Sequence, residues 1–312
     1  MSVDAVIFTV GLFLVMLLSA DSSERLFLCY VFAVPWFGLQ SNTGLTISID
    51  RMIAILTLLV VLGKAGPNAI MGFGALLLYL VGDTVVQSIE LPESAKYYPP
   101  LQGEYRWLFQ LVIWCLHLAP AMYAACLANA ELVTRAYRVF LGSMAVLSVL
   151  AIVQFVVFYA AGVDLFPIGI LSPSGETRTG MFNSESFMGG SVFRVCALGG
   201  EPKHLAYSIA LALTVLFADA MWRGPLGLSN RLRMGLAALF VTALVLTFST
   251  QGFVLVVANL VIAVGATLWM RPQGKFRIMN PLIAIAALLA AGAFLPGLRW
   301  RMAEREGWTC LN

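Results

Sequence analysis

The chain has 312 residues, 60% of them hydrophobic and only 11% charged, and its formal net charge at pH 7 is +3. Soluble globular proteins carry about 25% charged residues, so this composition excludes an ordinary soluble monomer. The hydrophobic residues form continuous runs along the chain, which excludes a single cleaved signal peptide and differs from the alternation of a transmembrane β-barrel. We predict an all-α, polytopic membrane protein in which residues 1–312 form a single transmembrane domain.

Apolar runs of roughly 17 to 25 residues are long enough to cross a bilayer, and we count about ten candidate helices along the chain. Two early candidates, Leu26–Leu39 and Ile53–Leu62, are shorter, and Pro35 interrupts the first. The clearest runs are Ala5–Ala20, Ala69–Val86, Trp107–Cys126, Val139–Ala161, Leu205–Trp222 and Pro281–Leu295.

Residues 234–270 contain no Asp, Glu, Lys, Arg or His. As one helix this block would extend about 55 Å, nearly twice the bilayer core of about 30 Å. We therefore predict that it folds back on itself as a hairpin. Its polar cluster, TFSTQG at residues 247–252, is the predicted turn.

The basic residues of the short loops predict the orientation of the bundle. Lys and Arg in short loops mark the cytoplasmic side, whereas long segments cross regardless of charge. The side of the bundle that carries the short basic loops is therefore predicted to be cytoplasmic. The polar loop 162–204, a further loop starting at about residue 297 and the C-terminus then face outward. The side of the N-terminus depends on the helix count between residues 20 and 62 and stays open. The short loops carry Arg135, Arg138, Arg223, Arg231, Arg233, Arg271, Lys275 and Arg277.

The segment RVCALGGEPKHLAY, residues 194–207, gathers the chain's most conspicuous polar cluster directly ahead of an apolar run. Glu201 is placed to cap a helix, and the proline after it suits the first helical position. Lys203 and His204 then lie in the first turn, where exposed N–H groups and the helix dipole favour an anion. Arg194 supplies a forked donor suited to phosphate oxygens. The pattern predicts a cradle for pyrophosphate.

A plainer interpretation of the same residues stays open. Basic side chains often lie at headgroup level at the ends of membrane helices, and Arg194 with Glu201 could form a surface ion pair. Polar residues in the turn at 247–252 are needed to close a hairpin in any case. The five cysteines have no metal-ligand spacing, and we predict neither a metal site nor a cofactor.

Three short motifs together resemble the O-antigen polymerase and O-antigen ligase superfamily. Arg194, the Gly-rich stretch after it, Glu201-Pro202 and the helix opened by HLA resemble the R…G…EP segment of that family. LTFSTQGF, at 246–253, is similar to its LTxSRGG turn, and LRWR, at 298–301, looks like the start of its large periplasmic loop. The resemblance covers roughly residues 140–305.

The resemblance implies a GT-C-like fold and a multi-pass glycosyltransferase of the bacterial inner membrane, with its active face toward the periplasm. Such enzymes polymerise or ligate oligosaccharides carried on polyprenyl pyrophosphate, without a metal or nucleotide sugar. Arg194 would bind the donor pyrophosphate, and Glu201 and His204 are candidate bases. The further substrate-binding candidates are Lys203, Arg178, Ser249, Thr250, Gln251 and Arg301.

Two departures from the family pattern shape this expectation. Thr250 and Gln251 replace the Arg and the first Gly of the family turn, which favours a polymerase over a ligase. The chain ends at Asn312 inside the outer loop, before the histidine thought catalytic in the ligases. The resemblance thus implies a fragment, a truncated product or a shortened relative.

The expected partners are the lipid-linked oligosaccharide, membrane lipids, a chain-length regulator and other polysaccharide-export proteins, with no nucleic acid. Two alternatives remain. A flippase or transporter of a lipid-linked glycan would place functional charges near the bilayer midplane, and only His117 approaches that position. A non-catalytic membrane subunit of the same pathway would use the Arg194 cluster to bind a partner.

Overall fold

The computed structural model describes residues 22–36, 40–41, 47–64, 118–165, 184–187, 190–198, 202–222 and 224–270, with scattered single residues between 11 and 17 and between 66 and 116. The chain divides into two compact units. The first comprises residues 1–140 and 168–178, and the second comprises residues 141–167 and 179–312. Their assembly into the predicted single transmembrane domain stays a prediction.

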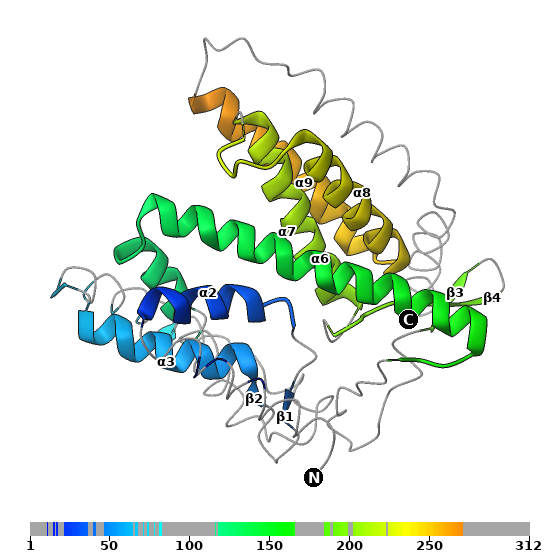
Figure 1. The fold of residues 1–312 in the computed structure, drawn as a ribbon, viewed down its shortest axis with the longest axis horizontal. Coiled ribbons are helices and arrows are strands. Elements are labelled where there is room, and N and C mark those ends of the chain that lie inside the picture. The colour runs from blue at the N-terminus through cyan, green and yellow to red at the C-terminus, as the bar shows by residue number, and fades with distance from the viewer. Residues whose placement is uncertain are drawn as a thin grey trace. The chain divides into compact units, whose positions relative to one another are not determined.

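The described part of the chain is mainly helical, as predicted (Figure 1). It also contains two short antiparallel strand pairs that the sequence analysis did not anticipate. β1 (Gln40–Ser41) pairs with β2 (Ile47–Ser48), and β3 (Ser184–Phe187) pairs with β4 (Gly190–Phe193). The helices are α2 (Ser23–Ala33), α3 (Ile49–Lys64), α6 (Ala130–Ala161), α7 (Pro202–Met221), α8 (Asn230–Leu246) and α9 (Thr250–Met270).

The helix limits follow from local capping chemistry. α2 ends at Ala33 rather than at the predicted residue 39. Val34 still has helical dihedrals and its N–H donates to the Tyr30 carbonyl, but Pro35 after it has no N–H with which to continue the helix. α6 begins well before the predicted residue 139. The Asn129 side chain accepts the Leu132 backbone N–H at 2.7 Å and so caps the helix at its start.

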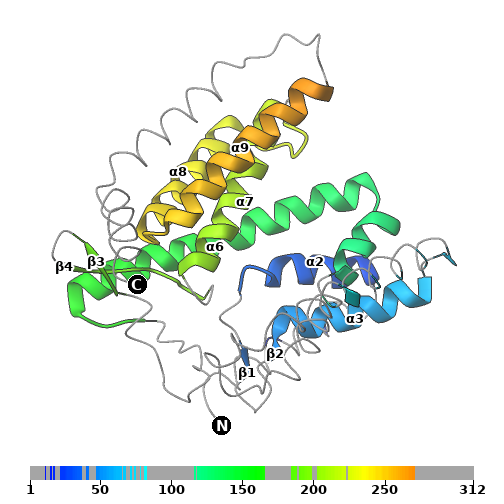
Figure 2. The ribbon, with the colours of Figure 1, turned by 180° about the vertical axis from the view of Figure 1, so that it is seen from behind.

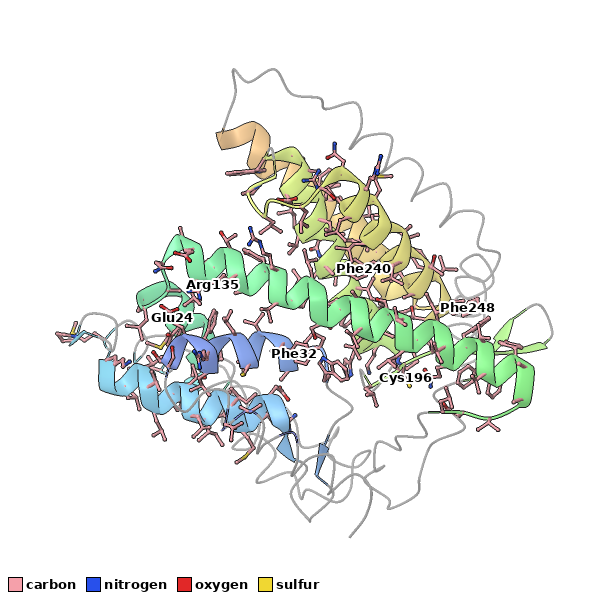
Figure 3. All side chains as sticks on the ribbon, in the orientation of Figure 1. Glu24, Phe32, Arg135, Cys196, Phe240 and Phe248 are labelled. Atoms are coloured by element: carbon pink, nitrogen blue, oxygen red, sulfur yellow. The ribbon has the colours of Figure 1, made fainter. Side chains whose placement is uncertain are left out.

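In the first unit, α2 packs against α3 through an apolar cluster that includes Leu26, Tyr30 and Ile53. At one end of this pair, the Glu24 carboxylate lies 2.7 Å from the Arg135 guanidinium. Figure 3 labels both residues. Because both side chains are more than 40% exposed, this ion pair contributes little to stability.

The second unit is built on α7, which packs against both α8 and α9, and the three helices lie side by side in both views (Figures 1 and 2). Buried residues of α7 recur every three or four positions, as expected for one apolar face. This face includes Leu205, Ala206, Ile209, Ala212, Leu216 and Asp219.

The predicted hairpin is confirmed. α8 ends at Leu246 and α9 begins at Thr250, so the turn lies in the predicted polar cluster. α7 and α9 therefore run in the same direction and begin at the same end of the unit. Their approach is close, because a Cβ added to Gly252 on α9 would lie 2.6 Å from the Ala206 Cβ on α7.

Two of the described helices, Ala130–Ala161 and Pro202–Met221, are long and apolar enough to cross a membrane. The first has 32 residues and extends about 48 Å, more than the hydrocarbon core requires. The ten-helix bundle and the GT-C-like fold stay predictions. The runs Ala5–Ala20, Ala69–Val86 and Pro281–Leu295 lie largely or entirely outside the described residues. The run Trp107–Cys126 is described continuously only from residue 118, and that part is helical as predicted.

Candidate functional site

The segment that contains Arg194 is bound to the turn between α8 and α9. The Arg194 Nε–H donates to the Thr247 carbonyl oxygen at 3.0 Å. The neighbouring backbone N–H of Val195 donates to the Leu246 carbonyl oxygen at 3.2 Å. The two motifs that the sequence analysis singled out, far apart along the chain, thus meet at one place.

The residues after Arg194 are held by Gln154, a fully buried residue of α6. Its Oε1 accepts the backbone N–H of Cys196 at 3.1 Å and that of Ala197 at 2.8 Å. Its Nε2 donates to Asp164 Oδ1 at 2.8 Å. Figure 3 labels Cys196, whose side chain is buried in the same region as this contact.

Aromatic contacts fix the strand that leads into the segment. The Phe193 ring stacks on Phe158 of α6, with a centroid separation of 3.8 Å and an interplanar angle of 11°. The Phe193 backbone N–H also donates to the Tyr159 hydroxyl oxygen at 3.2 Å. The Arg194 segment is therefore anchored on both sides, by α6 and by the α8–α9 turn.

The backbone is unusual on both sides of the Arg194–Thr247 contact. Among the residues that the structure describes, Ala197 (φ 45°) and Phe248 (φ 46°) are the two non-glycine residues with positive φ. This region is unfavourable for residues with a Cβ, and it persists where surrounding contacts impose it. Such conformations gather at functional sites. Here Ala197 lies three residues after Arg194, and Phe248 directly follows Thr247, the residue whose carbonyl Arg194 contacts.

Two helices begin at this end of the unit. α7 starts at Pro202, in the position predicted for that proline, and α9 starts at Thr250. The Tyr207 hydroxyl of α7 donates to Gln251 Oε1 of α9 at 2.6 Å, which ties the first turns together. Each start presents backbone N–H groups and the positive end of a helix dipole.

The predicted site residues on α7 and beside α9 can be placed individually. Arg194 is partly buried, Lys203 is exposed, and His204 is partly buried in the first turn of α7. Ser249 is buried, and its Oγ accepts the Gly252 N–H at 3.4 Å as a cap of α9. Gln251 is exposed.

The other predicted residues fall outside the description. Only the backbone of Thr250 is described, at the first position of α9. Glu201, Arg178 and Arg301 lie outside the described residues, as does His117 of the transport alternative.

Known protein families, curated proteins and solved structures contain no match to this chain. The resemblance to the O-antigen polymerase and ligase superfamily therefore stays a prediction.

The geometry is suited to an anion. A guanidinium, a lysine and a histidine lie at or near the start of two parallel helices, and both helix dipoles favour negative charge there. Within the described ranges, no three His, Cys, Asp or Glu side chains gather as metal ligands. The expectation that no metal takes part stays a prediction.

Sequence reasoning missed Gln154, Asp164 and Tyr207. Gln154 had a usable signal, since it is a polar residue within the apolar run Val139–Ala161. A buried amide requires hydrogen-bond partners, and in an apolar environment those partners are few. Tyr residues are common at membrane interfaces, so the sequence around Tyr207 gave no indication that it contacts another helix.

Proposed function

We propose that this protein is a multi-pass glycosyltransferase of the bacterial inner membrane that uses a glycan linked to polyprenyl pyrophosphate. It transfers the glycan to a hydroxyl of a second sugar, as a polymerase or as a ligase, on the outer face of the membrane. The proposal includes about ten transmembrane helices in a GT-C-like arrangement, each long enough for the hydrocarbon core.

One observation carries this proposal: Arg194 is anchored to the α8–α9 turn at the end of the second unit where α7 and α9 both begin. The contact of the Nε–H with the Thr247 carbonyl oxygen fixes the position of the guanidinium. A diphosphate bound at this end would meet fixed positive charge next to apolar helices that accommodate its lipid.

The reaction requires charge stabilisation on the leaving group. The acceptor oxygen forms a bond to the anomeric carbon while the bond from that carbon to the phosphate oxygen breaks. The electron pair leaves with the polyprenyl pyrophosphate, and the acceptor proton passes to a base. Preorganised donors such as the Arg194 guanidinium stabilise the negative charge that develops on the pyrophosphate.

A general base must lie near the acceptor hydroxyl. His204, partly buried in the first turn of α7, and Glu201, directly before that helix, are the two residues assigned to this role. Lys203, exposed in the same turn, contributes charge for the donor. A chain-length regulator and other export proteins are the proposed protein partners.

Replacing Arg194 tests the proposed function directly. In the strain that carries the gene, Arg194→Ala is expected to reduce glycan transfer about 100-fold or more, as for removal of a preorganised donor to an oxyanion. Arg194→Lys keeps the charge but loses the fork and is expected to retain part of the activity. The measurement is the chain-length distribution of surface glycan together with the amount of lipid-linked glycan.

Arg231 supplies the matched control, because it is an exposed arginine in the first turn of α8, at the other end of the second unit. Arg231→Ala should leave both glycan measurements unchanged. A normal surface polymer in the Arg194→Ala strain, with the variant protein present at the wild-type level, would refute the proposed function.

A further inference from the structure

We propose that Gln154 is a positioning residue, which acts on the donor pyrophosphate by fixing the backbone that carries Arg194. The effect on binding rests on the proposed function, whereas the effect on the backbone can be measured without it. Gln154 itself has no assigned contact with the substrate.

Gln154 occupies a position at which an apolar residue would be expected. It continues a buried face of α6 that includes Met144, Leu147 and Ala151, and its own exposed fraction is 0%. A buried carboxamide is unfavourable unless its donors and acceptors are paired. Here the amide is paired with the backbone of the Arg194 segment and with the Asp164 carboxylate, so it holds that segment against α6.

The constraint reaches Arg194 along a short path. The Gln154 oxygen accepts from Cys196 and Ala197, the second and third residues after Arg194. Ala197 has a φ of 45°, which costs free energy and must be imposed by its surroundings. Two hydrogen bonds to one oxygen impose it. Without them, this end of the segment would relax, and the Arg194 Nε would lose its fixed approach to the Thr247 carbonyl.

The donor and acceptor pattern requires an amide at this position. The oxygen must accept from two backbone N–H groups, while the nitrogen must donate to the Asp164 carboxylate and also lies 3.8 Å from the Cys196 Sγ. Gln154→Met removes both functions at nearly constant size. Gln154→Glu keeps the acceptor but places a second carboxylate against Asp164.

The amide of Gln154 and the carboxylate of Asp164 can also be exchanged between the two positions. In the double variant Gln154→Glu, Asp164→Asn, the glutamate accepts from both backbone N–H groups and the asparagine donates to its other oxygen. This double variant should restore the hydrogen bonds that either single substitution disrupts. A residue that only fills space in the core would not be rescued in this way.

The first test uses Cys196, which is buried with 2% exposed, as a reporter in full-length protein in detergent. The other cysteines, Cys29, Cys115, Cys126 and Cys310, are replaced by serine. We expect Gln154→Met and Gln154→Glu to raise the rate of N-ethylmaleimide modification of Cys196 about tenfold or more, since the loss of one buried hydrogen bond alone corresponds to about tenfold. The double variant should return the rate to within about threefold of wild type.

Ser148 gives the matched control. It is fully buried on α6, and its hydroxyl has no hydrogen-bond partner among the residues that the structure describes. Ser148→Ala should leave Cys196 as protected as in the wild-type chain. Protection of Cys196 that is unchanged in Gln154→Met would overturn the inference.

The second test measures affinity for farnesyl pyrophosphate in detergent. Arg194→Ala should abolish binding, Gln154→Met should weaken it about tenfold or more, and the double variant should restore it. Wild-type affinity in Gln154→Met would overturn the positioning role. If Arg194→Ala binds as tightly as wild type, the proposed function fails, and the Cys196 rates alone decide whether Gln154 holds the segment.

Discussion

Gly252 determines how closely α7 and α9 approach each other. A Cβ at this position would lie 2.6 Å from the Ala206 Cβ and 3.1 Å from Leu244 Cδ1. The first of these neighbours is directly attached to the α7 backbone, so it can move only with its helix. Because Arg194 is bound to the turn just before α9, a shift of α9 would also displace the site.

We predict that Gly252→Ala destabilises the protein by about 1 to 3 kcal/mol, the usual cost of overpacking a well-packed contact. The measurement is thermal unfolding in detergent. Gly265, on the same helix, has no atom within 4 Å of an added Cβ, so Gly265→Ala should be neutral or slightly stabilising. The double variant Ala206→Gly, Gly252→Ala should recover much of the lost stability, because it removes the Cβ that the new one would meet. If Gly252→Ala alone is as stable as wild type, the close contact between α7 and α9 is contradicted.

At single residues, the sequence predicted some features well and others not at all. Pro202 at a helix start followed from residue chemistry and position, whereas the role of Arg194 stays a prediction. The contact with Thr247 was not predictable, because it uses a backbone carbonyl, and any residue could have supplied it. Gln154 was likewise assigned no role, since its partners are backbone N–H groups of a distant segment.

The connection between α7 and α8 is held by a buried ion pair. Asp219 Oδ2 accepts from the Arg233 Nε at 3.0 Å and from its Nη2 at 2.8 Å. Asp219 Oδ1 accepts the Leu226 backbone N–H at 2.7 Å. The carboxylate side chain is only 1% exposed and that of Arg233 is 17% exposed. The pair therefore fixes both the helix ends and the loop between them.

We predict that Asp219→Ala destabilises the protein by about 3 kcal/mol, because it leaves a largely buried guanidinium without its carboxylate. Arg233→Ala should cost a similar amount. The double variant should cost less than the sum of the two, which a double-mutant cycle in detergent can measure. Arg231→Ala, an exposed change on the same helix turn, should stay within about 0.5 kcal/mol. Additive effects of the two changes would contradict this pairing.

At the scale of elements, hydrophobic runs located the described helices but not all of their limits. The hairpin at 234–270 was predictable because its length exceeds a bilayer. The early start of α6 depends on one Asn129 cap, and the strand pair β3–β4 lies in a loop whose polarity concealed it. The contact between α7 and α9 depends on Gly252, whose role is visible only when the helices are assembled.

At the scale of the whole molecule, the second unit has two chemically different ends. The Arg194 segment, the α8–α9 turn and the end of α6 gather at one end, through contacts such as Phe158 with Phe193. The α7–α8 connection, with Arg231 and Arg233, forms the other. Basic residues next to short connections favour the cytoplasmic side, so we predict that the end with Arg231 and Arg233 faces the cytoplasm.

This orientation can be measured with two single cysteines in a chain that lacks its native ones. Val163 is 52% exposed just after α6, and Pro225 is exposed in the α7–α8 connection. We predict that a membrane-impermeant maleimide labels Val163→Cys in intact cells. It should label Pro225→Cys only after permeabilisation, because that position lies on the side of the short basic loops. Labelling of both positions after permeabilisation controls for reactivity. The reverse pattern in intact cells would place Arg194 in the cytoplasm, away from the face at which the proposed transfer occurs.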